Sequence, residues 1–251
     1  MDLEPITSAR NPRFRLWKSY LQAPEDPDCP WIAVEGPKQA LDLSLQHRIA
    51  LLLYSDENSV AALVSRQAPP RVRLPLDLLS RLTRVRSHQG LIAFFQKPVW
   101  SWEEISKWVL YLEEIQDPGN LGTLLRTARA TGLFSLLASP GAVSFFNSKV
   151  VRASGGALFQ VPFLEGIPLG ELKRRNYRVV VVCPSAQESL MEREFTPRTA
   201  FVLGNEGRGV SGEARESCDG ALRIPMEPGS DSLNASVSGS LIMYQVYLRR
   251  P

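Results

Sequence analysis

The chain contains little that several common classes of protein require. Only three cysteines and two histidines occur among its 251 residues. Cys29, Cys183 and Cys218 are isolated and odd in number, which predicts neither a disulfide framework nor a zinc cluster. No apolar run approaches the ~18 residues of a membrane helix, and the N-terminus lacks the basic-then-apolar pattern of a signal peptide. We therefore expect a cytoplasmic protein with reduced thiols and no metal site.

Motifs of the common nucleotide-binding and hydrolytic folds are also missing or misplaced. There is no Gly-Lys-Ser/Thr for a phosphate-binding P-loop, and no Gly-x-Ser-x-Gly for a Ser–His hydrolase. Residues 207–212 match the dinucleotide fingerprint Gly-x-Gly-x-x-Gly, with Asp231 about twenty residues further on. Fewer than fifty residues follow Gly207, too few for the two halves of a Rossmann domain. We interpret this match as coincidental and keep an NAD-dependent enzyme as an alternative.

The charge distribution is more informative than the net charge of +3. Six arginines and one acid lie between Arg66 and Arg86, and a second basic cluster between Arg10 and Lys18 is interleaved with aromatic residues. Arginine together with aromatic side chains suits phosphate contact and base stacking. Two such clusters in the N-terminal third favour a nucleic-acid partner, and a solvated surface is the alternative.

The pattern along the chain predicts two domains joined by a linker. Residues 1–97 are typical of a small mixed α/β domain, and residues 98–106 carry the proline and turn-forming residues of a linker. Over 107–251, apolar runs such as Trp108–Leu112, Phe134–Ala138 and Ala200–Leu203 alternate with helical segments. This alternation predicts an α/β fold with a mostly parallel sheet covered on both faces.

The last predicted helix, residues 232–250, is apolar nearly all round. Such a helix is buried in a core or against another subunit. We hypothesise that a dimer partner covers it.

Three short blocks in the second half of the chain carry the functional signal. They are Asn120–Arg126, Leu203–Ser211 and Ile224–Ser236. The middle block follows an apolar strand and has glycine at 204, 207 and 209, which lets main chain approach a ligand closely. In the first block, Asn120 is a plausible helix N-cap and Arg126 projects away from the apolar stripe. Together they predict a cofactor pocket with polar side chains beside it.

At these residues the chain resembles the SpoU/TrmH-type RNA ribose 2′-O-methyltransferases of the SPOUT superfamily. The first motif of that family appears as Asn120, Gly122 and Arg126, the second as Gly204–Gly209 with Glu206 at its centre, and the third as Ile224–Met226 with Ser232–Ser236. Residues 147–157 look like a further family stretch. Residues 6–12 and 33–36 are similar to the N-terminal substrate-binding domain of many members, which is itself similar to small RNA-binding ribosomal proteins.

The resemblance implies a C-terminal domain with a trefoil knot, a homodimer formed through that domain, and S-adenosylmethionine as cofactor. It implies methylation of a ribose 2′-hydroxyl in structured RNA, and the separate N-terminal domain favours rRNA over tRNA. The cofactor-binding residues would be Leu203, Gly204, Asn205, Gly207, Gly209, Ile224, Met226 and Leu233. The catalytic or RNA-positioning residues would be Arg126, Asn120, Glu206, Ser232 and Asn234.

The role that the resemblance implies for Arg126 must fit the positive charge of its side chain. Because an arginine side chain stays protonated at neutral pH, we interpret Arg126 as a group that binds the target phosphate and polarises the hydroxyl. The identity of the proton acceptor stays open. The alternative from another class is an RNA-binding protein that keeps the fold without the chemistry, and the presence of Asn120, Arg126, Glu206 and Asn234 argues against it.

Overall fold

The computed structural model describes residues 1–83, 89–230 and 232–249. Arg86 and Asp231, named above, lie outside these ranges, as do Arg84 of the same basic cluster and His88. The chain divides into two compact units, the first made of residues 1–98 and 146–152 and the second of residues 99–145 and the chain from 153 onward. Within the described ranges, no helix is long and apolar enough to span a membrane.

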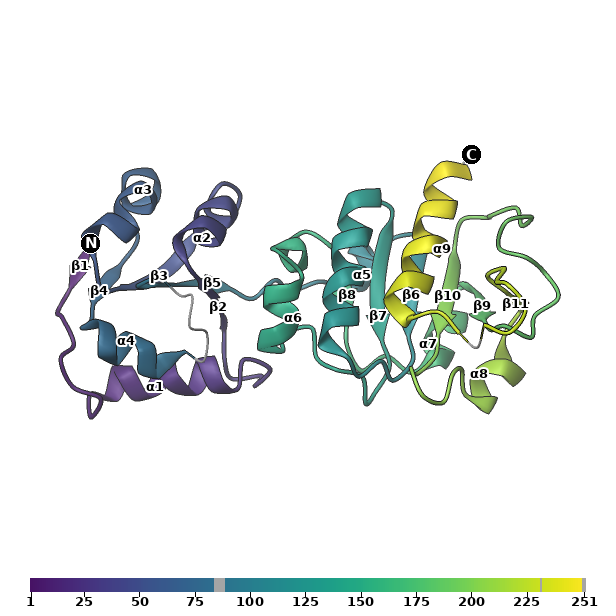
Figure 1. Cartoon of the computed structure of the whole chain (residues 1–251), viewed down its shortest axis with the longest axis horizontal. Coiled ribbons are helices and arrows are strands. Elements are labelled where there is room, and N and C mark those ends of the chain that lie inside the picture. The colour runs from purple at the N-terminus through teal and green to yellow at the C-terminus, as the bar shows by residue number, and fades with distance from the viewer. Residues whose placement is uncertain (84–88, 231, 250–251) are drawn as a thin grey trace. The chain divides into compact units, whose positions relative to one another are not determined.

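The first unit is built on a five-stranded mixed sheet. Its strand order is β1 (Asp2–Leu3), β4 (Arg71–Arg73), β3 (Ile49–Tyr54), β5 (Leu91–Gln96) and β2 (Trp31–Glu35). β5 runs antiparallel to both of its neighbours, while β1, β4 and β3 pair in parallel. Helices α1 (Pro12–Gln22) and α4 (Leu76–Leu82) lie on one side, and α2 (Pro37–Ser44) and α3 (Glu57–Gln67) on the other (Figure 1). The mixed α/β character follows the sequence pattern.

Gln67, the last residue of α3, joins three parts of this unit. Its Nε2 donates to the carbonyls of Ser44 (2.6 Å) and His47 (2.9 Å). Its Oε1 accepts from the backbone N–H of Ile49 at 2.8 Å. One amide side chain thus links the end of α2, the following turn and the start of β3 by binding main-chain groups of all three.

The first-unit arginines do not all form a free basic surface. Arg71 is only 19% exposed, forms an ion pair with Asp2 and lies over the ring of Tyr54 at 5.8 Å. Arg66, Arg73 and Arg81 are exposed. The predicted cluster is therefore divided between one structural arginine and solvent-facing ones.

The second unit is built on a six-stranded sheet in which every pairing is parallel. The strand order is β11 (Gly220–Leu222), β9 (Arg178–Val182), β10 (Thr199–Leu203), β6 (Trp108–Leu112), β7 (Phe134–Ala138) and β8 (Phe163–Leu164). The predicted α/β fold with a parallel sheet is confirmed. Since side chains alternate between the faces of a strand, fully apolar strands such as β6 require cover on both.

Helices provide that cover. On one face, Leu169 and Leu172 of α7 (Leu169–Arg174) and Ala214 of α8 (Gly212–Ser217) pack into a core with alternate residues of β6, β9 and β10. On the other, α5 (Pro118–Thr131) and α9 (Ala235–Arg249) lie side by side (Figure 1). The remaining elements are α6 (Ser148–Ala153), of which residues 148–152 belong to the first unit, and the short helices η1 (Trp102–Glu104) and η2 (Ala157–Phe159).

Glycines permit the close packing of α5 and α9. A Cβ added at Gly239 of α9 would lie 2.4 Å from Leu124 Cδ2 and 2.9 Å from Leu203 Cδ1. A Cβ at Gly122 of α5 would lie 2.3 Å from Ala153 Cβ. The family-motif glycine Gly122 therefore has a packing role.

The segment predicted as a linker is attached to the second unit over most of its length. Trp102 of η1 stacks under the guanidinium of Arg175, 4.0 Å from the ring centroid. Ser106 N–H donates to Ser135 Oγ at 2.9 Å, and Ser106 Oγ donates to the carbonyl of Leu133. Residues 101–106 thus belong structurally to the second unit.

Candidate functional site

A cavity of about 410 Å³ opens at the carboxyl ends of the central strands of the second unit. Three chain segments form its walls: residues 182–184 after β9, residues 203–210 after β10, and a third segment from Ile224 to Ser238. Small-molecule sites typically measure roughly 300–1,000 Å³ and lie at this edge of parallel sheets. The cavity therefore has the place and the size of a cofactor site.

Every predicted cofactor-binding residue lines this cavity. These are Leu203, Gly204, Asn205, Gly207, Gly209, Ile224, Met226 and Leu233. Of the residues predicted to be catalytic, Glu206, Ser232 and Asn234 also line it, whereas Asn120 and Arg126 do not.

The glycine-rich loop after β10 closes on itself. A Cβ at Gly204 would lie 2.1 Å from the main-chain carbon of Gly209 and 2.2 Å from the amide nitrogen of Val210. Gly209 N–H donates to the carbonyl of Asn205 at 2.8 Å, and Gly209 has φ +69°. Only glycine at 204 allows this backbone-to-backbone approach, which leaves main-chain groups to form one wall of the cavity.

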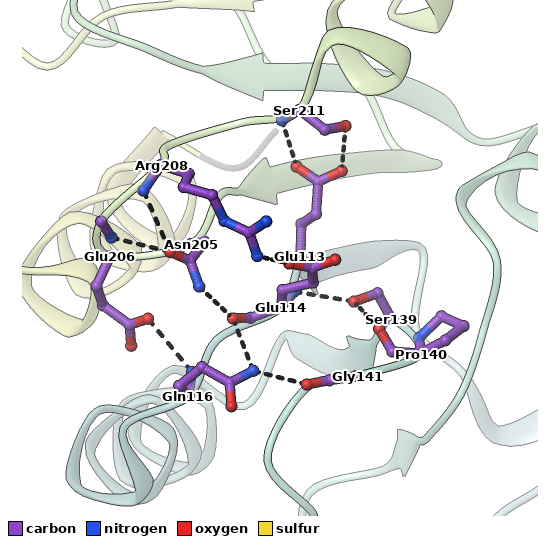
Figure 2. Close-up of polar contacts among 11 residues, drawn as sticks. Glu113, Glu114, Gln116, Ser139, Pro140, Gly141, Asn205, Glu206, Arg208 and Ser211 are labelled. Atoms are coloured by element: carbon purple, nitrogen blue, oxygen red, sulfur yellow. Dashed lines mark hydrogen bonds and ion pairs between the residues drawn. The ribbon is translucent and has the colours of Figure 1, made fainter.

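Asn205 fixes this loop to the segment that follows β6. Its Oδ1 accepts from the N–H groups of Gly207 (2.9 Å) and Arg208 (3.2 Å), and its Nδ2 donates to the carbonyl of Glu114 at 2.8 Å. Glu114 has φ +51°, which is uncommon for a residue other than glycine. Its carbonyl also accepts from Gln116 Nε2 at 3.2 Å (Figure 2).

Two acidic side chains, Glu113 and Glu114, form further contacts between the segment after β6 and the glycine-rich loop. Glu113 accepts from Ser211 N–H at 2.8 Å and from Ser211 Oγ at 2.6 Å. Glu114 forms an ion pair with Arg208, which lines the cavity and is 77% exposed. Figure 2 shows these groups bridging the two chain segments.

Glu206 joins the cavity loop to the start of α5. Its carboxylate accepts from Asn120 Nδ2 at 3.1 Å and from the N–H groups of Gln116 and Asp117, both at 3.3 Å. Burial raises the pKa of Glu206, but its own N–H, Asn120 and these two N–H groups outweigh burial and hold the pKa below its ordinary value of 4.5. Glu206 is therefore a carboxylate anion already engaged by donors, which makes it a poor proton acceptor.

The predicted N-cap role of Asn120 is wrong. Helix α5 begins at Pro118, and its N-cap is Asp117, whose side chain accepts from Asn120 N–H at 2.8 Å. Proline is favoured at the first helical position, and this moves the helix start three residues ahead of the position expected. The Asn120 side chain, only 7% exposed, is thereby free to bind Glu206.

Arg126 lies on the exposed face of α5, outside the cavity lining. Leu121, Leu124, Leu125 and Ala128 are buried, as the stripe predicted. Six residues of helix separate Arg126 from Asn120, a rise of roughly 9 Å. The structure therefore joins Asn120 to Glu206 directly and presents Arg126 to solvent two turns further along.

The third block ends in the N-cap of the last helix. Asn234 Oδ1 accepts from Ser236 N–H at 2.8 Å and from Ser236 Oγ at 2.6 Å. Helix α9 therefore begins at Ala235, not at 232 as predicted, because the Asn234 side chain binds the first free N–H groups. Ser232 is exposed at the cavity wall.

Part of the cavity wall was not predicted from the sequence. Val182, Cys183 and Pro184 follow β9 and line the cavity, as do Arg208, Val210, Ala235 and Ser238. Val182, Cys183 and Pro184 lie at the carboxyl end of β9, a parallel strand next to β10. Ligands bind at the carboxyl ends of strands in such sheets, so this rule could have predicted these three residues. No group of three or more potential metal ligands occurs in the part of the chain that the structure describes.

Comparison with known proteins gives one consistent family. Residues 107–244 match the model of the SpoU rRNA Methylase family. The 23S rRNA (guanosine-2'-O-)-methyltransferase RlmB of Bordetella pertussis is 34% identical over 197 residues, 74% of this chain and 79% of that protein. The 23S rRNA (guanosine(2553)-2'-O)-methyltransferase RlmP of Bacillus subtilis is 27% identical over 248 residues, 97% of this chain and 99% of its own length.

Solved structures share the fold over nearly the whole chain. The SpoU methyltransferase AviRb from Streptomyces viridochromogenes has a TM-score of 0.81 at 25% identity, covering 96% of this chain and 98% of its own. An AdoMet-bound rRNA methyltransferase from Sinorhizobium meliloti has a TM-score of 0.84 at 23% identity, covering 100% and 99%. The latter likeness shows the fold alone.

Proposed function

Because the chain belongs to the SpoU rRNA Methylase family, we propose that this methyltransferase uses S-adenosylmethionine to methylate a ribose 2′-hydroxyl of structured RNA, more specifically rRNA. The observation that carries the proposal is the single cavity wall shared by the second and third family motifs, with Glu206 linking it to the first motif on α5. Relatives named as 23S rRNA 2'-O-methyltransferases along nearly the whole chain support an rRNA substrate.

The cavity fits the cofactor in size and in the chemistry of its walls. Leu203, Ile224 and Leu233 supply apolar surface for a purine, and the glycine loop supplies main-chain donors and acceptors. A purine base bound in this way needs no charged side chain in its immediate surroundings. We assign adenosine binding to this wall and the outer part of the cavity, near Arg208, to the amino-acid end.

When bound, S-adenosylmethionine supplies a methyl group already activated by its sulfonium. The task left to the chain is to align the 2′-oxygen, and alignment can contribute roughly 7–11 kcal/mol to such a reaction. The electron pair of the sulfur–methyl bond would stay on sulfur, and the 2′-hydroxyl would release its proton on transfer. Glu206 positions the start of α5 and does not take the proton, because its carboxylate is occupied.

Arg126 binds the phosphate next to the target ribose in this proposal. Its exposed position on α5 suits contact with a large substrate better than contact with the cofactor. A planar guanidinium binds phosphate through two parallel hydrogen bonds, which lysine cannot do. Arg126→Lys should therefore lower kcat/KM for RNA by about tenfold or more with an unchanged cofactor Kd. Near-normal turnover would discredit any role that needs the planar fork.

A transfer assay tests the proposed function directly. Purified protein, S-adenosylmethionine labelled in its methyl group and unmodified 23S rRNA transcripts should give label in RNA, and digestion should locate it on a 2′-O-methyl nucleotide. The same assay with tRNA transcripts decides between substrates. Label on a base, or none in any RNA, would refute the proposal.

Cofactor binding also separates the alternative functions. A ligand at 100 times its Kd stabilises a protein by about 2.7 kcal/mol, so S-adenosylmethionine should raise Tm and NAD should not. An RNA-binding protein without the chemistry would show no such rise, and an NAD-dependent enzyme would show the reverse pattern.

The trefoil knot implied by the family belongs to this proposal. The closed loop at Gly204 and the tight seating of Gly239 against Leu110, Leu124 and Leu203 support threaded segments at this place. In single-molecule pulling, a knotted chain should extend to less than its full contour length. Full extension would exclude a knot.

A homodimer through α9 is the second part of the proposal. Val237, Leu241, Tyr244 and Leu248 form an apolar stripe along α9 and are 37–72% exposed in the single chain. Val237, Leu241 and Tyr244 border, together with Thr123 of α5, an apolar groove of about 270 Å³. Exposed apolar stripes of this kind mark interaction sites. Sedimentation as a monomer at micromolar concentration would remove the dimer.

The first unit is proposed to bind RNA, as the ribosomal-protein-like domain of the family does, in the cytoplasm where rRNA is assembled. Arg10 and Arg15 are exposed, and the Arg13 guanidinium lies 5.2 Å from the ring centroid of the buried Trp17. Arginine already stacked on an aromatic ring retains donors for phosphate. Arg10→Ser/Arg15→Ser should weaken RNA binding and leave cofactor binding unchanged.

A further inference from the structure

A row of three basic residues lies at the amino ends of adjacent strands in the second unit. Lys107 directly precedes β6, Arg178 begins β9 and Arg198 directly precedes β10. The backbones are in contact, because Arg178 N–H donates to the carbonyl of Arg198 at 2.7 Å and Thr199 N–H donates to the carbonyl of Lys107 at 3.1 Å. The three backbone positions are adjacent, because neighbouring strands lie about 4.8 Å apart. The register pairs Arg178 with Thr199, so the Arg178 guanidinium lies by Gly220 whereas that of Arg198 lies over Tyr177. We call these three residues the basic edge.

The basic edge has no acidic partner within the described ranges. All three residues are exposed, and none of them forms an ion pair there. The nearby carboxylates are engaged elsewhere: Glu171 binds Arg174 and Arg175, and Asp219 binds Lys173 at 3.4 Å. The row therefore presents cations that the fold itself does not neutralise.

Neighbouring cations are unfavourable for the fold. The buried Arg193 is ion-paired with Glu188, and its Nη1 lies near Gly220 together with the guanidinium of Arg178. Like charges held this close repel each other. A row that folding alone would not favour indicates an anionic partner outside the chain.

Aromatic side chains flank the row. The Arg198 guanidinium lies 5.8 Å from the ring centroid of Tyr177 and donates to the carbonyl of Arg175, which itself lies over Trp102. These contacts hold Arg198 in a defined orientation with donors remaining. Arginine oriented on a ring is typical of phosphate recognition.

We propose that the basic edge binds the phosphate backbone of the substrate RNA at a distance from the methylated nucleotide. This inference rests on the proposed function for the identity of the anion. The cavity lies at the carboxyl ends of the same strands, and five residues at about 3.3 Å each place the two edges roughly 16 Å apart. The contacted phosphates therefore belong to nucleotides that flank the target, and a short RNA would not reach them.

The test is the salt dependence of RNA binding by Lys107→Ser/Arg178→Ser. Each lost phosphate contact lowers the slope of log K against log salt by about 0.7–0.9. For two contacts the slope should fall by about 1.4–1.8. If the affinities converge at 1 M salt, they should differ roughly 25- to 60-fold at 0.1 M. The probe is an unmodified 23S rRNA transcript in filter binding, repeated with short fragments for which variant and wild type should agree.

The matched control is Lys173→Ser/Arg174→Ser, which removes two cations from the same region that are already ion-paired. It should change the slope by less than one. An unchanged slope for the edge variant, or an equal loss in the control, overturns the proposal. Cofactor affinity checks that each variant is folded, and Lys107→Gln/Arg198→Gln serves as a second pair if the first fails that check.

Binding does not require turnover, so the two proposals fail separately. Wild type that binds RNA with the steep slope but transfers no methyl group refutes the proposed function and leaves the basic edge standing. Active wild type with an edge variant of equal slope refutes the basic edge alone.

Discussion

Removing the Glu206 carboxylate should separate the cavity loop from α5. In Glu206→Ala, the N–H groups of Gln116 and Asp117 and the Asn120 amide lose their shared acceptor. The two N–H groups belong to exposed residues and can turn to water, so the cost is that of a lost helix cap, about 0.5–2 kcal/mol. Loss of a negative charge near the start of α5 adds about 0.3–1 kcal/mol.

A combined loss of about 1–3 kcal/mol predicts a clear thermal shift. For a domain of this size, 1 kcal/mol corresponds to about 2–4 °C, so Tm should fall by about 2–12 °C. Cofactor affinity should fall with it, because Glu206 also lines the cavity. Glu216→Ala is the matched control, since Glu216 is exposed on α8. Equal Tm and equal cofactor Kd for Glu206→Ala and wild type would refute the reasoning.

The pH dependence of the free energy of unfolding tests the same contribution of Glu206. The pKa of Glu206 in the folded protein lies below its ordinary value of 4.5, so ionised Glu206 stabilises the fold. The stabilisation is complete above 4.5 and is lost as pH falls through the folded pKa. The difference between wild type and Glu206→Gln in urea unfolding should therefore be constant from about pH 6 to 8 and shrink below 4.5. A larger difference in acid than at neutrality would contradict it.

Two further substitutions test other contacts. Gly204→Ala should abolish measurable cofactor binding by calorimetry, because the new Cβ would meet the main chain of Gly209 at 2.1 Å; Gly212→Ala, with nothing within 4 Å, is the control and should bind normally. Gln67→Leu should lower the free energy of unfolding by about 1–3 kcal/mol, because it leaves partly buried backbone groups unsatisfied. Cofactor affinity unaffected by Gly204→Ala, or a stable Gln67→Leu, would show those contacts to be unimportant.

The sequence was most informative where one physical rule dominates. The strands Trp108–Leu112 and Phe134–Ala138 have the bounds predicted, because long apolar runs have no place except the middle of a covered sheet. The glycine loop was found because three glycines in six positions after a strand indicate close backbone approach. The residues of the second and third family motifs lie around one cavity, and Asn120 of the first motif binds Glu206 in its wall.

Features that depend on long-range contacts were missed. Asn120 was misinterpreted as an N-cap because its contact with Glu206, 86 residues away, has no local signal, although Asp117 and Pro118 are local signals for the start of α5. Residues 98–106 were interpreted as a linker because Pro98 and the turn-forming residues near it are a local signal, whereas the stacking of Trp102 on Arg175 is not. Val182–Pro184 carry no motif, and they contribute to the cavity only because β9 lies beside β10.

The three-segment wall of the cavity has a consequence for the order of folding. Its parts are separated by up to about fifty residues, and the sheet beneath pairs β6 with β10, roughly ninety residues apart. Closing such large loops is slow and comes late in the acquisition of native structure. The methyl donor therefore cannot guide early collapse. It should stabilise the protein only after folding is complete. Cells depleted of S-adenosylmethionine should therefore degrade this chain faster.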